Sequence, residues 1–437
     1  MKTYLTTVLG LAVLCSAGLA AEPSASHLLQ RLEEQNKKMA ALMARVQELE
    51  AQQDSMRKAI NEEIGRTDAL AGKIGKGVEV PSWVQKSKIS GDLRYRCERI
   101  DDESKDDVRI RHRIRARLQF AFKPCDDLDV YLRLASGGGN SDGSCVDWEG
   151  DPVSSNQTLG HFFTSKHVWL DLAYFDWHPN QMPGFHILGG KMKMPFHKPQ
   201  KSQLLWDGDL NPEGLAFKYG TSPGETTHLF ASMAGFWVKE NGGGADNMLY
   251  GAQAGVTQEI GAAKLTVGGG YYNYTNIKGS GAYDFECDDN FFGNSNDGTS
   301  FTEDYQIAEA FVELGLKAGP LPLAIYGDFA KNTGASGGDD TGWLVGFNVG
   351  KCKAPGSWSF GYNYREVEAD AVLGAFCDSD FGGGGTGHKG HVVSLGYQVT
   401  KCLQLGITCF RNDKHGANSA KDSVDYTRTQ VDLKMKF

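Results

Sequence analysis

Long apolar runs are missing from this 437-residue sequence once its first 21 residues are set aside. A membrane-spanning helix needs about 18 or more consecutive apolar residues, and no later segment approaches that length. The sequence also has no C-x-x-C, G-x-S-x-G or H-E-x-x-H motif, and its 11 histidines are dispersed. We therefore predict no helical membrane domain, no metal site, no cofactor and no enzyme active site.

The first residues have the pattern of an export signal. Lys2 precedes the apolar run TVLGLAVLC, and small residues at 18–20 provide a cleavage site. Cys15 allows a lipoprotein signal as the alternative, but the residues before it lack the small side chain that such a site needs. We predict a signal peptide over 1–21 and an exported mature chain.

Residues 22–72 carry an apolar heptad pattern. Eight of the eleven core positions are apolar, which is typical of an α-helical coiled coil. These positions are Leu28, Leu32, Gln35, Met39, Leu42, Val46, Leu49, Gln53, Met56, Ile60 and Glu63. We predict a periplasmic coiled coil that self-associates, followed by a linker over 73–86 that contains Pro81. A single charged helix is the alternative.

Short runs of alternating apolar and polar residues fill the chain from 87 to 437. A period of two is typical of β-strands, and sixteen such segments can be counted. Every second connection is long, including 137–165, 195–212, 276–304, 368–390 and 413–424, and the others are tight turns. Outer-membrane barrels show this asymmetry, whereas a soluble sandwich or β-helix does not require it. We predict an all-β transmembrane antiparallel β-barrel of about 16 strands over 87–437, preceded by the coiled coil.

The final nine residues, TQVDLKMKF, predict one amphipathic strand that ends in an aromatic residue. Val431, Leu433, Met435 and Phe437 share one face of this strand. A terminal aromatic in such a strand resembles the signal by which bacterial outer-membrane proteins are recognised during assembly. We therefore expect the barrel-assembly machinery and outer-membrane lipid as partners.

Arginine occupies every second position of the segment RIRHRIRARLQF. On a helix this spacing would scatter the guanidinium groups, but on a strand it places them on one face. In a barrel that face lines an aqueous lumen, while intervening residues such as Ile110 and Ile114 meet lipid. We expect Asp92, Glu98 and Asp129 on the neighbouring strands to neutralise part of this charge. A nucleic-acid patch is the alternative, which export and the strict alternation disfavour.

Several segments resemble those of the bacterial putative porin family. They are KISGDLRYR, RIRHRIRARLQF, LDLAYFDWHP, LGGKMKMPF and, most specifically, LLWDGDLNPEGLAFKY, and the similarity covers 83–437. It implies an outer-membrane porin, a passive diffusion channel for small hydrophilic solutes and ions. From the heptad pattern we expect a homotrimer, because general porins of this size are trimers. The resemblance brings no catalytic residue and no particular substrate. A structural anchor that presents a periplasmic coiled coil is the alternative function.

Two groups of residues are candidates for the channel. The expected pore-lining residues are Arg94, Arg96, Arg109, Arg111, Arg113, Arg115, Arg117 and Arg133. The third long loop is expected to fold inward and narrow the pore with Lys198, Lys201, Asp207, Asp209 and Glu213. The alternative is that its acidic residues only cap a turn.

Acidic residues also gather in the loop around 284–297, where Asp and Asn oxygens could hold calcium. Their spacing matches no EF-hand pattern, so we predict a solvated loop without a metal. Eight cysteines remain after residue 21, and their pairing does not follow from their spacing.

Overall fold

The computed structural model describes residues 25–74, 82–137, 150–283, 290–416 and 419–437. The chain divides into two compact units, Met1–Val80 and Pro81–Phe437. Each unit is considered separately. The predicted signal peptide lies outside the described residues, as do Cys15, Cys145 and Cys287.

The first unit contains one continuous helix, α2 (Ala25–Ile74), of 50 residues. Its heptad residues Met39, Leu42 and Val46 are each exposed over at least half of their surface. The helix agrees with the expected secondary structure, and its association into a coiled coil stays a prediction. In the described parts of the chain, no helix combines the length and the apolar character needed to cross a membrane.

The second unit begins with α3 (Ser82–Gln85) and continues as one antiparallel sheet. Its elements are β1 (Lys88–Asp102), β2 (Arg109–Cys125), β3 (Leu128–Ser136), β4 (Gln157–Thr158), β5 (Val168–Trp177), β6 (Phe185–Lys191), η1 (Pro199–Lys201), β7 (Glu213–Thr221), β8 (Thr227–Lys239), β9 (Asn247–Ile260), β10 (Ala263–Tyr274), β11 (Tyr305–Ala318), β12 (Leu321–Asn332), β13 (Thr341–Gly350), β14 (Trp358–Val367), η2 (Gly374–Phe376), β15 (His388–Gln398), β16 (Leu403–Gly416) and β17 (Ser419–Lys436).

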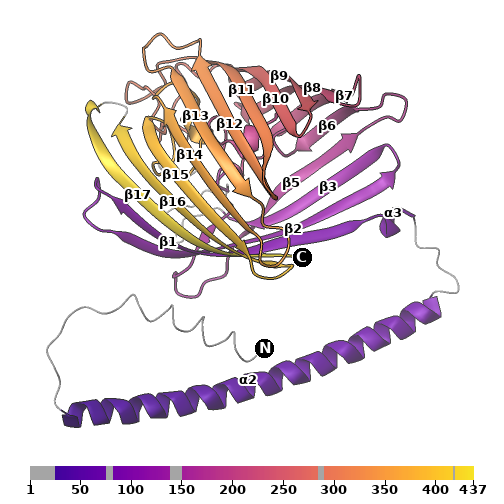
Figure 1. Ribbon diagram of the computed structural model, residues 1–437, viewed down its shortest axis with the longest axis vertical. Coiled ribbons are helices and arrows are strands. Elements are labelled where there is room, and N and C mark those ends of the chain that lie inside the picture. The colour runs from indigo at the N-terminus through magenta and orange to yellow at the C-terminus, as the bar shows by residue number, and fades with distance from the viewer. Residues whose placement is uncertain (1–24, 75–81, 138–149, 284–289, 417–418) are drawn as a thin grey trace. The chain divides into compact units, whose positions relative to one another are not determined.

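The sheet closes on itself. Each long strand pairs with its neighbours along the chain, and β1 pairs with both β2 and β17 (Figure 1). In the pairing of β1 with β17, Asp92 lies opposite Lys436. Without the two-residue β4, which pairs only with β2, the closed barrel has the sixteen strands predicted from the sequence. Closure satisfies the backbone hydrogen bonds that an open edge would leave unpaired.

The predicted loop 413–424 is wrong in extent. Strand β16 continues to Gly416 and β17 begins at Ser419, so most of this segment is a hairpin. Its sequence is mostly polar, with Val424 as its one large apolar residue, and a search for apolar alternation does not detect strands of that composition. In the same way, β1 extends to Asp102 and shortens the first loop.

Alternate residues of the strands face opposite environments. On β1, Tyr95 is 41% exposed on the outer side, whereas Arg96 and Glu98 are buried on the inner side. Large apolar side chains recur on the outer surface around the barrel, among them Leu215, Val312 and Ile407. An apolar exterior and a polar interior are the arrangement that a barrel in a lipid bilayer requires.

Candidate functional site

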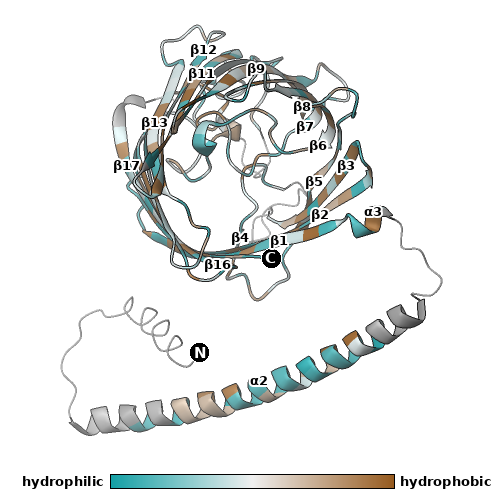
Figure 2. Ribbon diagram, turned by 45° about the vertical axis from the view of Figure 1, so that its right-hand side comes forward, coloured by the Kyte–Doolittle hydropathy of each residue, from teal (hydrophilic) through white to brown (hydrophobic). Residues whose placement is uncertain are grey.

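The third loop (192–212), which joins β6 to β7, is folded into the barrel. In Figure 2 the strands form a ring, and several loops cross its interior. Trp206 is 2% exposed, and its indole N–H donates to the hydroxyl of Tyr274 on β10 at 3.0 Å. The side chain of Gln253 on β9 holds the backbone of His197, accepting from its N–H at 2.6 Å and donating to its carbonyl at 3.0 Å. These contacts fix the loop at two points.

Apolar packing fills one side of the lumen. The third loop contributes Leu204, Leu205 and Trp206 to a buried cluster that also contains residues of the fifth loop (275–304) and the seventh loop (368–387). Met192 and Phe196 of the third loop also belong to it, and strands β6 to β14 contribute the other side chains. The loops are therefore held by the hydrophobic effect, and the open part of the lumen is displaced toward the other strands.

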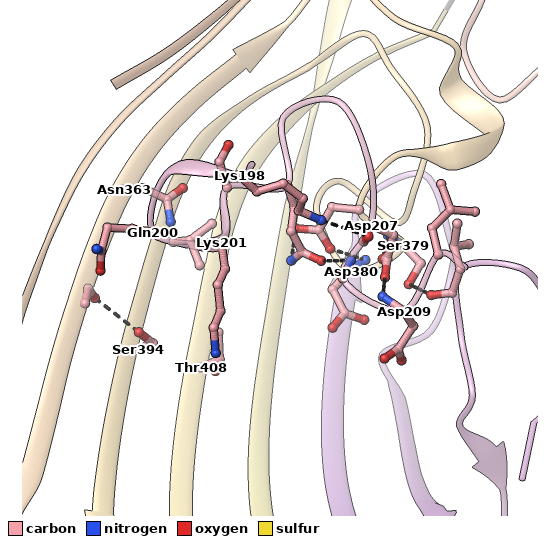
Figure 3. Close-up of a pocket in the computed structure, with 18 of the residues that line it drawn as sticks. Lys198, Gln200, Lys201, Asp207, Asp209, Asn363, Ser379, Asp380, Ser394 and Thr408 are labelled. Carbon is pink, nitrogen blue, oxygen red and sulfur yellow. Dashed lines mark hydrogen bonds between the residues drawn. The ribbon is translucent and has the colours of Figure 1, made fainter. Parts of the chain in front are cut away.

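A cavity of about 690 Å³ occupies that other side. It lies between the third and seventh loops and the inner faces of β1, β2, β3 and β12 to β17 (Figure 3). Polar side chains dominate its wall, such as Asn363 on β14, Ser394 on β15 and Thr408 on β16. This arrangement leaves a water-accessible space at the level of the loops.

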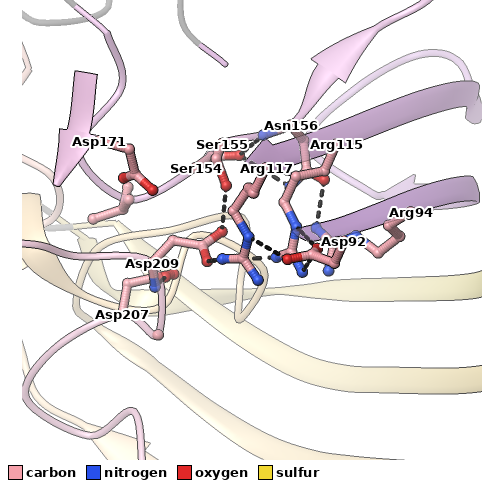
Figure 4. Close-up of polar contacts among 12 residues, drawn as sticks. Asp92, Arg94, Arg115, Arg117, Ser154, Ser155, Asn156, Asp171, Asp207 and Asp209 are labelled. Atoms are coloured by element: carbon pink, nitrogen blue, oxygen red, sulfur yellow. Dashed lines mark hydrogen bonds and ion pairs between the residues drawn. The ribbon is translucent and has the colours of Figure 1, made fainter. Parts of the chain in front are cut away.

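Asp209 of the third loop faces the arginines of β2 (Figure 4). Its carboxylate lies 3.5 Å from Arg115 and 3.3 Å from Arg117. From β1, Asp92 pairs with the same two guanidinium groups at 3.0 and 2.8 Å. Burial raises the pKa of Asp209, but the charges of Arg115 and Arg117 outweigh this effect, and the net shift is downward. Asp209 is therefore ionised at neutral pH.

The seventh loop supplies a second acidic group, which the sequence analysis did not identify. Asp380 lies 3.2 Å from Arg96 and 2.6 Å from Arg428. Asp432 pairs with Arg96 at 2.6 Å, and Glu98 pairs with Arg428 at 2.7 Å. Burial opposes ionisation of Asp380, but Arg428 and Arg96 hold its pKa well below the usual range.

The remaining predicted arginines have different positions. Arg133 borders the cavity, whereas Arg111 and Arg113 are not part of its wall. Arg111 pairs with Glu98 at 2.5 Å, and Arg113 donates to the Asn156 carbonyl at 3.3 Å. The remaining one, Arg109, is exposed at the end of β2 and does not border the cavity either.

One expected neutralising contact, that of Asp129 with the arginines of β2, was wrong. Asp129 pairs with Lys123 at 3.2 Å and not with the arginines of β2, because the register places Arg117 opposite Ala135, several residues further along β3. Arg133 pairs instead with Asp171. Asp171 is the extra residue of a register shift between β3 and β5, and regular alternation does not predict its inward side chain.

Glu213 is also not part of the narrowing. It is the first residue of β7, and its side chain is 61% exposed and pairs with Lys191 at 2.7 Å. Lys201 is exposed and borders the cavity, as expected for the third loop. Lys198 also borders it, and its ammonium group donates to the carbonyls of Trp206 and Asp207 at 2.9 and 3.0 Å. Burial lowers the pKa of Lys198.

Asp207 has a structural position between loops. Its carboxylate accepts from the backbone N–H groups of Ser379 at 3.0 Å and Asp209 at 2.7 Å. Its own N–H donates to the carbonyl of Phe376 at 2.8 Å. Burial raises its pKa well above the usual value, and the nearby charge of Asp378 adds to this shift. Asp207 thus joins the third loop to the seventh and does not oppose the arginines.

Comparison with known proteins gives a family match. The family model described as "Putative porin" matches residues 100–303 and 299–437. None of the curated proteins with which the chain was compared matches it.

Several solved outer-membrane proteins are similar in fold. The chain resembles OprB of Pseudomonas putida, in its high-pH structure, with 12% identity over 80% of this chain and 94% of that chain and a TM-score of 0.53. It is also similar to DcaP of Acinetobacter baumannii, with 15% identity, coverage of 80% and 97% and a TM-score of 0.45. For OmpT of Vibrio cholerae in its trimer form, the identity is 14%, the coverage 80% and 99% and the TM-score 0.45.

Proposed function

The chain belongs to the Putative porin family, whose members are outer-membrane channels, and we propose that its pore passes small hydrophilic solutes and ions with a preference for anions. The route follows the cavity between the third loop, the seventh loop and the inner faces of β1, β2 and β17. Diffusion through it is passive. The anchor function receives no support from the family match, which concerns a channel rather than an enzyme or a tether.

The charge around the cavity carries this proposal. Ten basic side chains border it, but only five carboxylates do. The basic residues are Arg94, Arg96, Arg115, Arg117, Arg133, Lys193, Lys198, Lys201, Arg365 and Lys434, and the acidic ones are Asp207, Asp209, Asp378, Asp380 and Asp432. Asp92 and Asp171 of the barrel wall pair with three of these arginines. A positive excess remains, and it raises the local concentration of anions.

Lys193 and Lys201 make the preference testable without breaking an ion pair. Both lysines are exposed, and no carboxylate lies within 4 Å of either ammonium group in the described part of the chain. Changing both to Gln therefore removes two positive charges from the cavity and leaves no carboxylate unpaired. Gln keeps a polar side chain of similar length.

Reversal potentials across a KCl gradient in planar bilayers measure the effect. We expect the parent to prefer chloride and the Lys193→Gln/Lys201→Gln variant to shift toward potassium, most strongly at low salt, where the Debye length is about 30 Å at 0.01 M. The control is Lys353→Gln/Lys401→Gln, which removes two exposed lysines from short turns outside the cavity. A parent without conductance contradicts the channel, and equal shifts in both variants contradict the assignment to this cavity.

Assembly is part of the same proposal. The heptad residues of α2 support self-association of the helix, and a homotrimer with the helices in the periplasm agrees with the pattern. Lipid and the barrel-assembly machinery remain the expected partners of the barrel.

A further inference from the structure

Inward residues of β17, β1 and β2 form rows across the basic side of the lumen. The register places four such rows side by side: Lys436, Asp92 and Arg117; Lys434, Arg94 and Arg115; Asp432, Arg96 and Arg113; and Gln430, Glu98 and Arg111. Three of the rows contain a carboxylate. The row through Arg94 has three cations and no acidic residue, although like charges directly opposite each other on a sheet are destabilising.

Arg94 is the central residue of that row and has the poorest compensation. Its neighbour Arg115 pairs with Asp92 at 3.0 Å, and Lys434 pairs with Asp432 at 3.2 Å. For Arg94, no carboxylate lies within the 4 Å of an ion pair among the residues that the structure describes. Within the described ranges its one hydrogen bond is to the neutral side-chain oxygen of Asn156, in the loop that follows β3.

The carboxylates that act on Arg94 from a longer distance are already engaged. Asp432 binds Arg96 through two hydrogen bonds, at 2.6 and 2.9 Å. Asp209 faces Arg115 and Arg117. Turning either group toward Arg94 would break contacts that it now makes with other arginines.

Arg94 is nevertheless almost completely enclosed. Only 8% of its surface is exposed, and its buried Nε–H has no acceptor within the described residues. The exposed part of the side chain borders the 690 Å³ cavity. Burial of a charged group without a counter-ion is costly, and structures normally avoid it by pairing. An anion in the cavity would remove this cost.

We propose that Arg94 is the anchor of an oxyanion-binding subsite, in which a carboxylate or phosphate group of a solute in the pore takes the place of the missing counter-ion. The guanidinium plane offers parallel N–H donors that match such a group. Arg115 and Lys434 add positive charge on either side. The inference rests on the proposed channel, because a solute reaches Arg94 only from the lumen.

Block of the chloride current in planar bilayers tests the subsite. Full-length protein is recorded in KCl while sodium acetate is added in one arm and sodium phosphate in the other, which separates the two oxyanions. For the parent we expect saturable block by at least one of them. Arg94→Gln should raise the half-blocking concentration roughly tenfold, because one charged hydrogen-bonding partner is lost. Arg94→Lys keeps the charge without the planar fork and should give an intermediate value.

Arg117→Gln is the matched control. It also removes one arginine from the cavity wall, but Arg117 already has two carboxylate partners, Asp92 and Asp209. Its half-blocking concentration should change less than about threefold, which is the size of a general field effect. Equal changes in Arg94→Gln and Arg117→Gln, or no saturable block of the parent by either anion, overturn the proposal.

Thermal unfolding gives a second reading that does not depend on conductance. The folded barrel is followed by its mobility on gels after heating at increasing temperature, with and without phosphate or acetate. We expect the blocking anion to raise the unfolding temperature of the parent but not that of Arg94→Gln. In the absence of the anion, the unfolding temperature of Arg94→Gln should be at least as high as that of the parent. If Arg94→Gln unfolds at a lower temperature than the parent and neither anion raises the unfolding temperature of the parent, Arg94 has a purely structural role and the proposal is wrong. If the parent conducts no current, the channel fails, and this measurement still decides the subsite.

Discussion

The carboxylate of Asp207 accepts a hydrogen bond of 3.0 Å from the backbone N–H of Ser379 and so connects two loops that are more than 150 residues apart in the sequence. Asp207 belongs to the third loop and Ser379 to the seventh. The two loops bound the cavity together. The width of the pore therefore depends on the junction between the two loops, and not on the third loop alone.

Replacing Asp207 should loosen the junction. Asp207→Ala leaves the N–H groups of Ser379 and Asp209 without their acceptor, at a cost of about 1–3 kcal/mol for each buried group. We expect larger current fluctuations in single-channel recordings. Asp207→Asn retains an acceptor oxygen and should behave more like the parent. The control is Asp297→Ala in the fifth loop, where the carboxylate accepts hydrogen bonds from the nearby Thr299 and Ser300. Equal noise in all three variants would show that the junction does not position the loops.

The contacts that hold the third and seventh loops against the arginines should break only in strong acid. The pKa values of Asp209 and Asp380 are lowered by neighbouring arginines, so their stabilising contribution is complete above the ordinary carboxyl pKa of about 3.9 and is lost as the pH falls through the lower folded values. Asp207, whose pKa is raised by burial, contributes in the opposite sense: its stabilisation is present in acid and is lost as the pH rises through its raised pKa. Conductance recorded from pH 7 to 2 should therefore change mainly below about pH 4.

Asp209→Asn provides the comparison for this profile. It removes one of the two loop carboxylates of lowered pKa that bind the arginines, so the acid transition should become smaller. An unchanged transition in this variant would locate the acid sensitivity elsewhere in the barrel.

Phe437 closes the barrel at its last residue. Its backbone exchanges two hydrogen bonds with Gly91 on β1, of 3.0 and 3.1 Å. A Cβ atom at Gly91 would lie 2.5 Å from the ring of Phe437 and 2.6 Å from the carbonyl oxygen of Arg117. We expect Phe437→Asp and Gly91→Ala each to reduce the fraction of heat-modifiable barrel, and removal of 419–437 to abolish it. Gly224→Ala, at a turn with open space around it, is the control. Normal assembly of Phe437→Asp would mean that the terminal aromatic is dispensable.

The apolar stripe of α2 should drive association of the helix. A peptide of residues 25–74 is expected to sediment as an oligomer with high helicity. Leu42→Lys together with Leu49→Lys places charges at two heptad positions and should give monomers, whereas Lys38→Glu, outside those positions, should not. A parent peptide that sediments as a monomer would remove the support that the helix gives to the trimer.

The barrel was predictable because most of its strands repeat one simple alternation, and Phe437 marks where the last of them ends. The inward fold of the third loop had a local signal as well, since Leu204, Leu205 and Trp206 are apolar residues in a loop. The seventh loop contains a comparable run, AVLGAFC, whose Ala371 and Leu373 are buried in the same cluster. That run was not recognised, and Asp380 was missed with it.

Partners across the sheet were harder to predict than the strands. Which carboxylate meets which arginine depends on register: Asp129 lies too far along β3 to meet the arginines of β2, and a single irregularity brings Asp171 to Arg133. The isolation of Arg94 likewise follows from the pairing of three strands, two of which lie at opposite ends of the barrel sequence. Alternation along one strand contains no information on these contacts.

The apolar cluster inside the lumen separates the shape of the pore from its charge. Trp206 and Leu204 hold the third loop by contacts that dissolved salt does not weaken, whereas the arginines act through a field that is screened within about 3 Å at 1 M salt. In concentrated electrolyte the passage should thus keep its dimensions and become indifferent to the sign of the ion. The size limit of the pore and its charge selectivity thus come from different residues, and ionic strength changes only the charge selectivity.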